Sequence, residues 1–456
     1  DPKQQYFSDG LSEELISDLT QIDGLKVIGK YSSFKFRDSK DSPAQIGVAL
    51  GVANLVEGSV QQNAGRIRIV VNLIRAKDGA SVWSHTYDKP LKDVFAIQSQ
   101  IGKAVASALQ VKLLGNAIVD ETKPPSGNVE AYRLMLQGRA VERRATNAAE
   151  FNQSVALLRK AVELDPNYAY AWGALSNTQI NLGSLYLTGD AQQKAYAEAR
   201  AAADREFTLA PDAMATHVNR GYVLSWLDGD QTGALAQYRR ALTLAPHDGF
   251  AMQSLANQYG ILGQLQQAVD MFHKAIATDP LRPDWYYHLS FPLVAQGHLD
   301  QAEQAAHKAL TLQPDFPGLY SQLSEINILR GDAAAALRNA DKETDPDSKA
   351  LALALAKQIG GNVREADAAL KDYIAKYGKT QPYNVADLYA LRKQPDEMFQ
   401  WLDRARKQNK AGVANNLLTD PLLLRYKHDP RFAALCKQLG LPAPGQPLPA
   451  AVASTP

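Results

Sequence analysis

Residues 263–280, GQLQQAVDMFHKAIATDP, and residues 297–314, GHLDQAEQAAHKALTLQP, decide the fold of this chain. When Gly263 is laid over Gly297, two alanines and the final proline of the stretches coincide as well. In the first stretch apolar residues recur every three or four positions, as one buried face of a helix requires. Pro280 lacks the amide that a helix needs and moves Asp279 out of the α region, so the helix should end there.

The same helix-ending proline recurs along most of the chain. It stands at Pro166, Pro211, Pro246, Pro280, Pro314 and Pro346, so that most neighbouring members of the series are separated by almost the same length of chain. A period near 34, the difference between Pro280 and Pro314, is typical of antiparallel helix pairs stacked into a solenoid. We therefore predict an all-α superhelix of about eight helical pairs over residues 129–410, with an extra loop near Gly189 in the longer unit that ends at Pro211.

The repeated residues resemble the tetratricopeptide repeat. In the unit from Gly249 to Pro280 the matching positions are Leu255, Ala256, Tyr259, Gly263, Ala268, Phe272, Ala275 and Pro280. Small residues at the alanine positions let helix axes approach closely, and Phe272 fills the gap to the next unit. The resemblance implies a right-handed superhelix with a concave surface formed by the first helix of each pair.

Residues 1–114 mix helical and strand periods, which predicts a small α+β domain before the repeats. Three segments, 54–62, 66–76 and 80–88, read as strands, and the middle one alternates as a sheet with one covered face does. A short strand at 26–28 would make about four. We expect Asp9 to cap a first helix and residues 91–114 to form a helix that covers the sheet.

Three motifs in this region resemble the small α/β domain related to the TolB amino-terminal domain: YFSDGL at 6–11, LVEGSV at 55–60 and WSHTYD at 83–88. Members of that family have one more strand just before the position of Asp1. The chain also starts without a methionine, so we interpret it as a fragment or a processed product. We therefore expect one edge of the sheet to lack its neighbour, and an unpaired edge invites pairing with another chain.

The remaining boundaries come from composition. Residues 115–128, with Pro-Pro-Ser-Gly inside them, predict a linker. Residues 411–441 resemble the closing segment of bacterial signalling proteins that join such a domain to repeats, and this segment would cap the last repeat. Residues 442–456 are rich in proline and alanine and should be disordered.

Composition and motifs argue against several classes of function. Lysine and arginine (49) almost balance aspartate and glutamate (48), so no overall field attracts nucleic acid or an anionic membrane. We predict no cofactor, no metal, no catalytic residue and no membrane insertion by these residues. Cys436 should be buried, and His85, between two aromatic strand residues, should be packed or half-exposed. The enzyme alternative is a hydrolase that uses His85 or an acidic pair in the α+β domain, and it requires a deep pocket with two convergent titratable groups.

A binding site is predicted on the first helices of successive repeats, where the period places one residue of each unit at an equivalent position. The row is Tyr222, Asn257, Phe291 and Glu325, and one turn earlier stand Val218, Gln253, Tyr287 and Ser321. Our site prediction is Tyr222, Asn257, Phe291, Glu325, Gln253 and Tyr287. Neither row contains lysine or arginine, which favours a largely uncharged peptide held by aromatic contact and amide hydrogen bonds. The alternative is that Phe291 and Tyr222 only pack between helices.

The combined resemblance is to bacterial signalling proteins in which such a domain and repeats follow a winged-helix DNA-binding domain or a class III nucleotide cyclase domain. It implies a non-catalytic regulatory region that binds a protein or peptide, including another domain of the same protein. We prefer the transcriptional regulator as the parent and keep the adenylate cyclase and a stand-alone periplasmic scaffold as alternatives. Homo-oligomerisation, and a location in the bacterial cytoplasm or periplasm, stay open.

Overall fold

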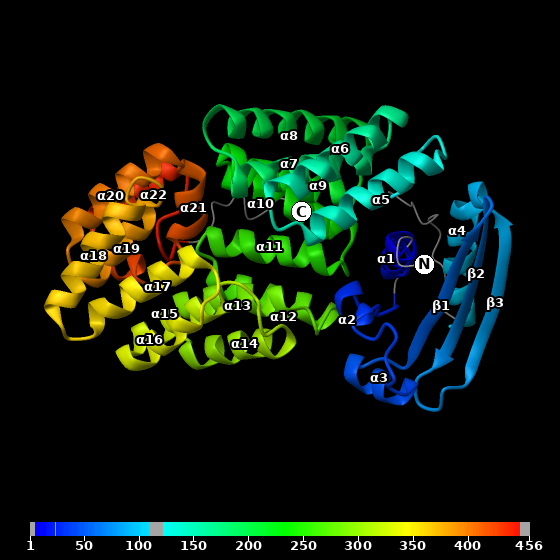
Figure 1. The fold of residues 1–456 in the computed structure, drawn as a ribbon, viewed down its shortest axis with the longest axis horizontal. Coiled ribbons are helices and arrows are strands. Elements are labelled where there is room, and N and C mark those ends of the chain that lie inside the picture. The colour runs from blue at the N-terminus through cyan, green and yellow to red at the C-terminus, as the bar shows by residue number, and fades with distance from the viewer. Residues whose placement is uncertain (1–4, 23, 110–121, 447–456) are drawn as a thin grey trace. The chain divides into compact units, whose positions relative to one another are not determined.

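The computed structural model describes residues 5–22, 24–109 and 122–446, which form two compact units (Figure 1). The first unit holds residues up to Val223, together with 240–251 and 278–280. The second holds 224–239, 252–277 and the residues from Leu281 onward. The predicted fold class is confirmed: a small α+β region is followed by paired helices.

The first unit begins with a three-stranded antiparallel sheet and the helices around it. These elements are α1 (Gln5–Thr20), α2 (Lys30–Phe34), α3 (Pro43–Leu50), β1 (Asn54–Asn63), β2 (Arg66–Arg75), β3 (Ser81–Pro90), the short 3-10 helix η2 (Leu91–Asp93) and α4 (Val94–Ala108). The strand order is β1-β2-β3. On β2 the residues Ile67, Ile69, Val71 and Leu73 are at most 4% exposed, and α4 packs against this face. The alternation in the sequence therefore identified the covered face correctly.

Two local predictions in this region are wrong. Residues 26–28 form no strand. Ile28 is buried, and the amide of Gly29 donates to the carbonyl of Thr278 at 2.8 Å. The segment therefore packs on a turn between repeats. The described sheet thus has three strands. Asp9 does not cap α1, because the helix already includes Gln5. The carboxylate of Asp9 instead forms an ion pair with Arg37. Residues 110–114 of the predicted covering helix, and 115–121 of the predicted linker, lie outside the described residues.

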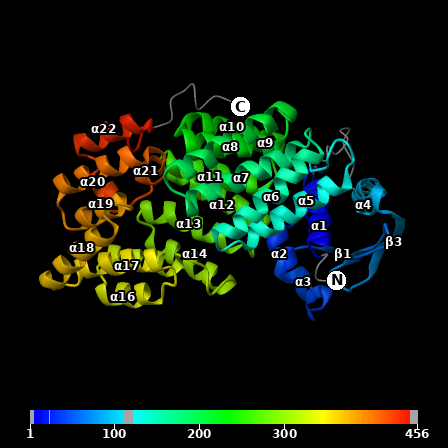
Figure 2. The same ribbon diagram turned by 45° about the horizontal axis from the view of Figure 1, so that its top comes forward.

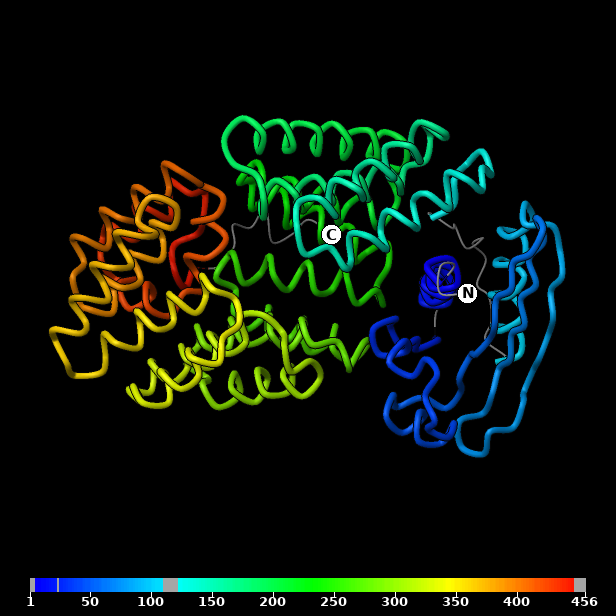
Figure 3. Tube along the Cα trace, in the orientation of Figure 1, coloured from blue at the N-terminus to red at the C-terminus, as the bar shows by residue number. Residues whose placement is uncertain are grey.

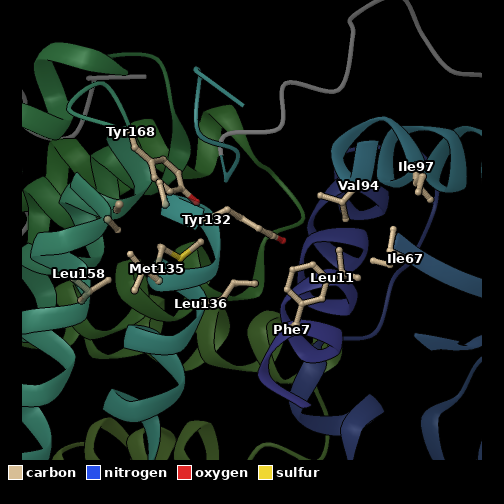
Figure 4. Close-up of a cluster of buried hydrophobic side chains, with 14 of the residues drawn as sticks. Phe7, Leu11, Ile67, Val94, Ile97, Tyr132, Met135, Leu136, Leu158 and Tyr168 are labelled. Atoms are coloured by element: carbon tan, nitrogen blue, oxygen red, sulfur yellow. The ribbon is translucent and has the colours of Figure 1, made fainter. Parts of the chain in front are cut away.

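Helix α1 packs directly on the first helix of the repeats, α5 (Val129–Arg144). A Cβ at Gly10 would lie 2.5 Å from a methyl carbon of Leu136, so only glycine permits this approach. The rings of Phe7 and Tyr132 meet edge to face at 6.1 Å. Figure 4 shows these side chains with Ile67 in one apolar cluster. The α+β region and the first repeats of this unit therefore share a core.

The repeats follow as helix pairs, eight of them within the described residues. In the first unit lie α5, α6 (Ala148–Leu164), α7 (Ala169–Tyr186), α8 (Gly189–Leu209) and α9 (Met214–Val223). Divided between the units are α10 (Gln231–Leu244), α11 (Gly249–Ile261) and α12 (Leu265–Thr278). The second unit starts with the π-helical turn η3 (Leu224–Asp228) and holds α13 (Pro283–Ala295), α14 (Leu299–Leu312), α15 (Leu319–Arg330), α16 (Ala333–Lys342), α17 (Pro346–Ile359), α18 (Val363–Tyr377), α19 (Pro382–Leu391) and α20 (Pro395–Gln408). Figure 2 shows α17 to α20 side by side in successive pairs.

The repeat positions have the packing roles that the motif predicts. Ala256, Ala268 and Ala275 are fully buried, and Phe272 is 1% exposed. Helix α12 ends at Thr278, shortly before Pro280. The long unit that ends at Pro211, however, has no extra loop near Gly189. Its additional residues lengthen α7 and α8, which contain 18 and 21 residues.

The second unit ends with α21 (Lys410–Leu417), the 3-10 helix η4 (Leu423–Tyr426) and α22 (Pro430–Leu439). Helix α21 packs on α20 and on α22. Cys436 is 1% exposed, as predicted. The predicted disordered tail lies mostly outside the described residues, which end at 446.

Candidate functional site

The predicted site residues come from the first helices of repeats in both units. Tyr222 lies on α9 in the first unit, whereas α11, α13 and α15 carry the other five at positions that belong to the second unit. Of the six, only Gln253 is buried; the other five are half-buried. We call the second-unit set the first-helix face. It consists of Gln253, Asn257, Tyr287, Phe291, Ser321 and Glu325, and of Tyr383 and Asp387, which follow two repeats later on α19.

Tyr222 belongs to a polar chain inside the first unit. Its hydroxyl donates to Oδ1 of Asn181 at 3.5 Å, and Nδ2 of Asn181 donates to Glu142 at 3.0 Å. Burial, with Glu142 and then Tyr196 adding to it, raises the pKa of Tyr222 to about 12. Tyr222 therefore bridges neighbouring helices, which agrees with the packing alternative for this residue.

The aromatic part of the first-helix face is Tyr287 and Phe291 on α13. Their rings meet edge to face at 4.9 Å, and Tyr287 also contacts Phe316 at 5.3 Å. Burial, with Glu325 and Glu343 adding to it, raises the pKa of Tyr287 to about 12. Tyr287 thus supports the packing of α13 and is itself half-buried.

Three carboxyl groups meet at the other end of this face: Glu325 on α15, Asp387 on α19 and Asp420 after α21. Burial, with Asp420 adding to it, raises the pKa of Glu325 to about 8. Burial, with Asp420 and then Glu325 adding to it, raises the pKa of Asp387 far above its usual value, and burial also raises that of Asp420. Among the described residues, no lysine, arginine or histidine forms an ion pair with any of the three. Burial and mutual repulsion therefore favour the protonated forms of these carboxyl groups.

Asp420 is held in place by several donors. The Tyr383 hydroxyl donates to its Oδ2 at 3.1 Å, and the amides of Leu422 and Leu423 donate to its Oδ1 at 2.9 and 3.1 Å. This carboxylate caps the turn into η4. It also links the end of the chain to the first helix of a repeat.

Asp420 is part of a segment that runs back over the first-helix face, and we call residues 415–426 the return segment. Leu418 and Thr419 lie against the end of α11, 3.2 and 3.4 Å from where a Cβ would stand on Gly263 and Gly260. Figure 3 shows this part of the chain, in red, beside α11. At the far end the Tyr426 hydroxyl donates to the carbonyl of Ala390 on α19 at 2.8 Å. The chain therefore covers part of its own first-helix face.

An amide cluster fixes the start of the return segment. Oδ1 of Asn415 accepts from Nε2 of Gln231 at 2.9 Å and lies 3.4 Å from Oγ of Ser225. Oε1 of Gln231 in turn accepts from Oγ of Ser225 at 2.9 Å and from Nε2 of Gln258 at 3.0 Å. All four side chains are buried and belong to the second unit.

Sequence reasoning missed Asp387, Tyr383, Asn415 and Asp420 as parts of this site. A signal existed for the first two, because Asp387 follows Glu325 by close to two repeat lengths, and Tyr383 precedes it by one helical turn. The period weakens after Pro346, so the row was not extended. Nothing in the spacing indicated that Asn415 and Asp420 would return to this face.

The structure also shows where His85 lies and whether acidic, histidine or cysteine side chains gather elsewhere. His85 is exposed on the edge strand β3, so the prediction of a packed or half-exposed residue is wrong. Its ring centroid lies 6.1 Å from that of Trp83 and 4.5 Å from that of Tyr87. Within residues 5–22, 24–109 and 122–446, no three His, Cys, Asp or Glu side chains are grouped so that they could hold a metal ion. None of the helices in these ranges is both long and apolar enough to cross a membrane.

No protein-family model matches this sequence. Over 178 residues the chain is 35% identical to the protein described as "Putative adenylate cyclase 3" from Rhizobium meliloti (strain 1021). The matched region makes up 39% of this chain and 30% of that relative, so the chain spans less than a third of the relative's length.

Three solved structures share helical repeats with this chain. PilW, described as a type IV pilus biogenesis factor, is 16% identical, with 53% of this chain and 98% of PilW covered and a TM-score of 0.39. YrrB, a TPR protein with an unusual peptide-binding site, is 21% identical, with 42% and 90% covered and a TM-score of 0.28. The Cut9–Hcn1 structure of the APC/C is 14% identical, with 76% and 63% covered and a TM-score of 0.46. At such scores the likenesses carry no argument about arrangement or ligand, and it is the helix pairs and buried motif positions described above that make these repeats tetratricopeptide-like.

Proposed function

We propose that this chain is a non-catalytic, regulatory protein-interaction region of a larger bacterial signalling protein, and that the first-helix face receives a peptide or protein partner. The observation that carries the proposal is the character of that face. Successive first helices place amide, aromatic and carboxyl side chains at equivalent, half-buried positions, with no lysine or arginine in the row. Such side chains suit a largely uncharged extended or helical peptide.

Two parent proteins follow from the resemblances. A transcriptional regulator with an upstream winged helix rests on the TolB-like motifs of residues 6–88 together with the repeats. A class III adenylate cyclase is favoured by the 35% identity over 178 residues to the cyclase relative. The gene sequence 5′ of the codon for Asp1 distinguishes the two, because one parent encodes a winged helix there and the other a cyclase domain.

A photo-crosslinking experiment tests the binding face. A photoreactive amino acid is placed at Asn257 on α11 of the full-length protein in cells, and at the exposed Asp270 on α12 as the matched control. We expect a discrete adduct from position 257 that is absent from position 270. The adduct partner, once purified, should bind an Asn257→Ala variant more weakly. Equal adducts from both positions, or unchanged affinity of the variant, would contradict the assignment of the face.

A further inference from the structure

The return segment contacts the first-helix face at places where a bound peptide would. Its contacts run from Ser225 and Gln231, over the end of α11, to Tyr383 and Ala390 on α19. These contacts come from several different repeats of the second unit. One short stretch of chain therefore bridges three repeats of the second unit, those of α10, α11 and α19.

We propose that the return segment is an exchangeable occupant of the first-helix face, and that a partner binds by replacing it with a segment of the same chemistry. That chemistry is a buried amide at the position of Asn415, two leucines at 417–418 and a carboxyl group at the position of Asp420. The inference rests on the proposed function, since it names the class of peptide and the regulation of the same face. The tethered segment then acts as an internal competitor of the partner.

Unmatched polar atoms along this contact distinguish it from an ordinary core. Nδ2 of Asn415, and Oε1 of Gln258 in the same amide cluster, are shielded from solvent yet have no hydrogen-bond partner. Buried polar atoms in native proteins are nearly always paired, and leaving one unpaired costs free energy. A contact that carries such atoms is weaker than its buried area suggests, which suits a segment that must be replaced.

Apolar contacts keep the segment in place in the absence of a partner. Leu417, Leu418, Leu422 and Leu423 are each at most 2% exposed. Helices α20 and α22 hold its two ends, so the effective concentration of a tethered segment is high, in the millimolar range for short linkers. A partner in solution must overcome this local concentration.

The chain offers a matched pair for a test, because Asn415 and Asn416 are adjacent and identical in type. Asn415 is buried and contacts Gln231 and Ser225. Asn416 is exposed, and its side chain donates within its own helix, to the carbonyl of Gly412 at 2.8 Å. Replacing the first should remove contacts to the face. Replacing the second should not.

The experiment cuts the tether and offers the segment back. A protease site is inserted after the exposed Gln408 in the full chain, and a fluorescent peptide of residues 411–426, AGVANNLLTDPLLLRY, is titrated before and after cleavage with anisotropy as the readout. We expect at least tenfold tighter binding after cleavage. The peptide carrying Asn415→Ala should bind about tenfold more weakly, and the peptide carrying Asn416→Ala should bind within twofold of the original.

Three outcomes would overturn the proposal. They are no binding to the cleaved chain while its helical content is intact, loss of helical content on cleavage, and equal weakening by the two substitutions. Loss of helical content would show that the segment belongs to the core. Failure of this proposal can be told apart from failure of the proposed function. If partners bind the face beside a permanently bound return segment, the peptide experiment fails but the crosslinked adduct at position 257 still forms.

Discussion

Replacing Glu325 by glutamine should change how the stability of the second unit depends on pH. This residue shares its site with Asp387 and Asp420 and has Tyr383 nearby, and among the described residues no cation pairs with the three carboxyls. Glutamine keeps the size of the side chain and removes its titration. The variant therefore isolates the contribution of one proton.

The sign and size follow from the pKa of Glu325, which burial raises to about 8. A glutamate in an unfolded chain titrates near pH ~4.3, so between these values the folded state holds a proton that the unfolded state has released. The stabilising contribution is complete below about pH 4, and it is lost as the pH rises to about 8. The free energy of unfolding can fall by at most about 1.4 kcal/mol per pH unit in this range. Since Glu325 is half-buried and partly screened by water, we expect about half of this, or ~0.7 kcal/mol per pH unit.

Hydrogen exchange read by mass spectrometry, at pH 5, 6, 7 and 8 with rates corrected for intrinsic exchange, measures this locally. In the wild type, protection of α15, α19 and the return segment should fall with pH more than that of α13 and α14. In Glu325→Gln the decline should be shallower, with protection at pH 8 about 2 kcal/mol above the wild type. Asp372→Asn on the exposed surface of α18 is the control. The reasoning is refuted if the two variants show the same pH profile, or if protection in the wild type does not depend on pH.

Three further substitutions test other parts of the structure. Gly10→Ala places a methyl group 2.5 Å from Leu136 and should destabilise the first unit by about 1–3 kcal/mol in urea unfolding, whereas Gly102→Ala in α4, with open space, should stabilise it slightly; equal effects would count against the close packing of α1 on α5. Asp279→Ala removes the carboxylate that accepts from the first amides of α2. Hydrogen exchange in residues 29–36 should become faster, with a loss of about 1 kcal/mol in stability. Unchanged exchange would contradict a capping role for Asp279. Asn257→Ala should leave the melting temperature within about 2 °C of the wild type, and a larger fall would place this side chain in the core.

Much of the fold could be predicted because the sequence contains its own period. The alanines and prolines of residues 263–314 determine where helices approach and where they end, and those rules are local. The middle strand, β2, was equally readable from its alternation. The predicted fourth strand at 26–28 is wrong because three residues, Lys26, Val27 and Ile28, do not show what they will pack on. Ile28 is buried, and the amide next to it bonds to the carbonyl of Thr278, in a distant part of the chain.

The site was only partly predictable, for a similar reason. Equivalence between repeats places Asn257, Phe291 and Glu325 on the same face of successive helices, and this needs only the period. That Asp420 would join Glu325 depends on the curvature accumulated over several repeats, which is a sum of small rotations that no single motif encodes. Half-buried residues such as Tyr287 also cannot be assigned to one role from spacing alone.

The position of Asp420 links occupancy of the first-helix face to its protonation. While the return segment is in place, burial and then its Asp420 carboxyl group raise the pKa of Glu325 and of Asp387, which favours their protonated forms. A partner that brings a carboxyl group to the same position preserves this state, so the exchange involves almost no net uptake or release of protons and its affinity depends little on pH. A partner that brings lysine or arginine there instead lowers both pKa values and releases protons on binding, so its affinity rises with pH. Linkage is reciprocal, which means that the pH dependence of partner affinity identifies the charge that enters this site, even before the partner's sequence is known.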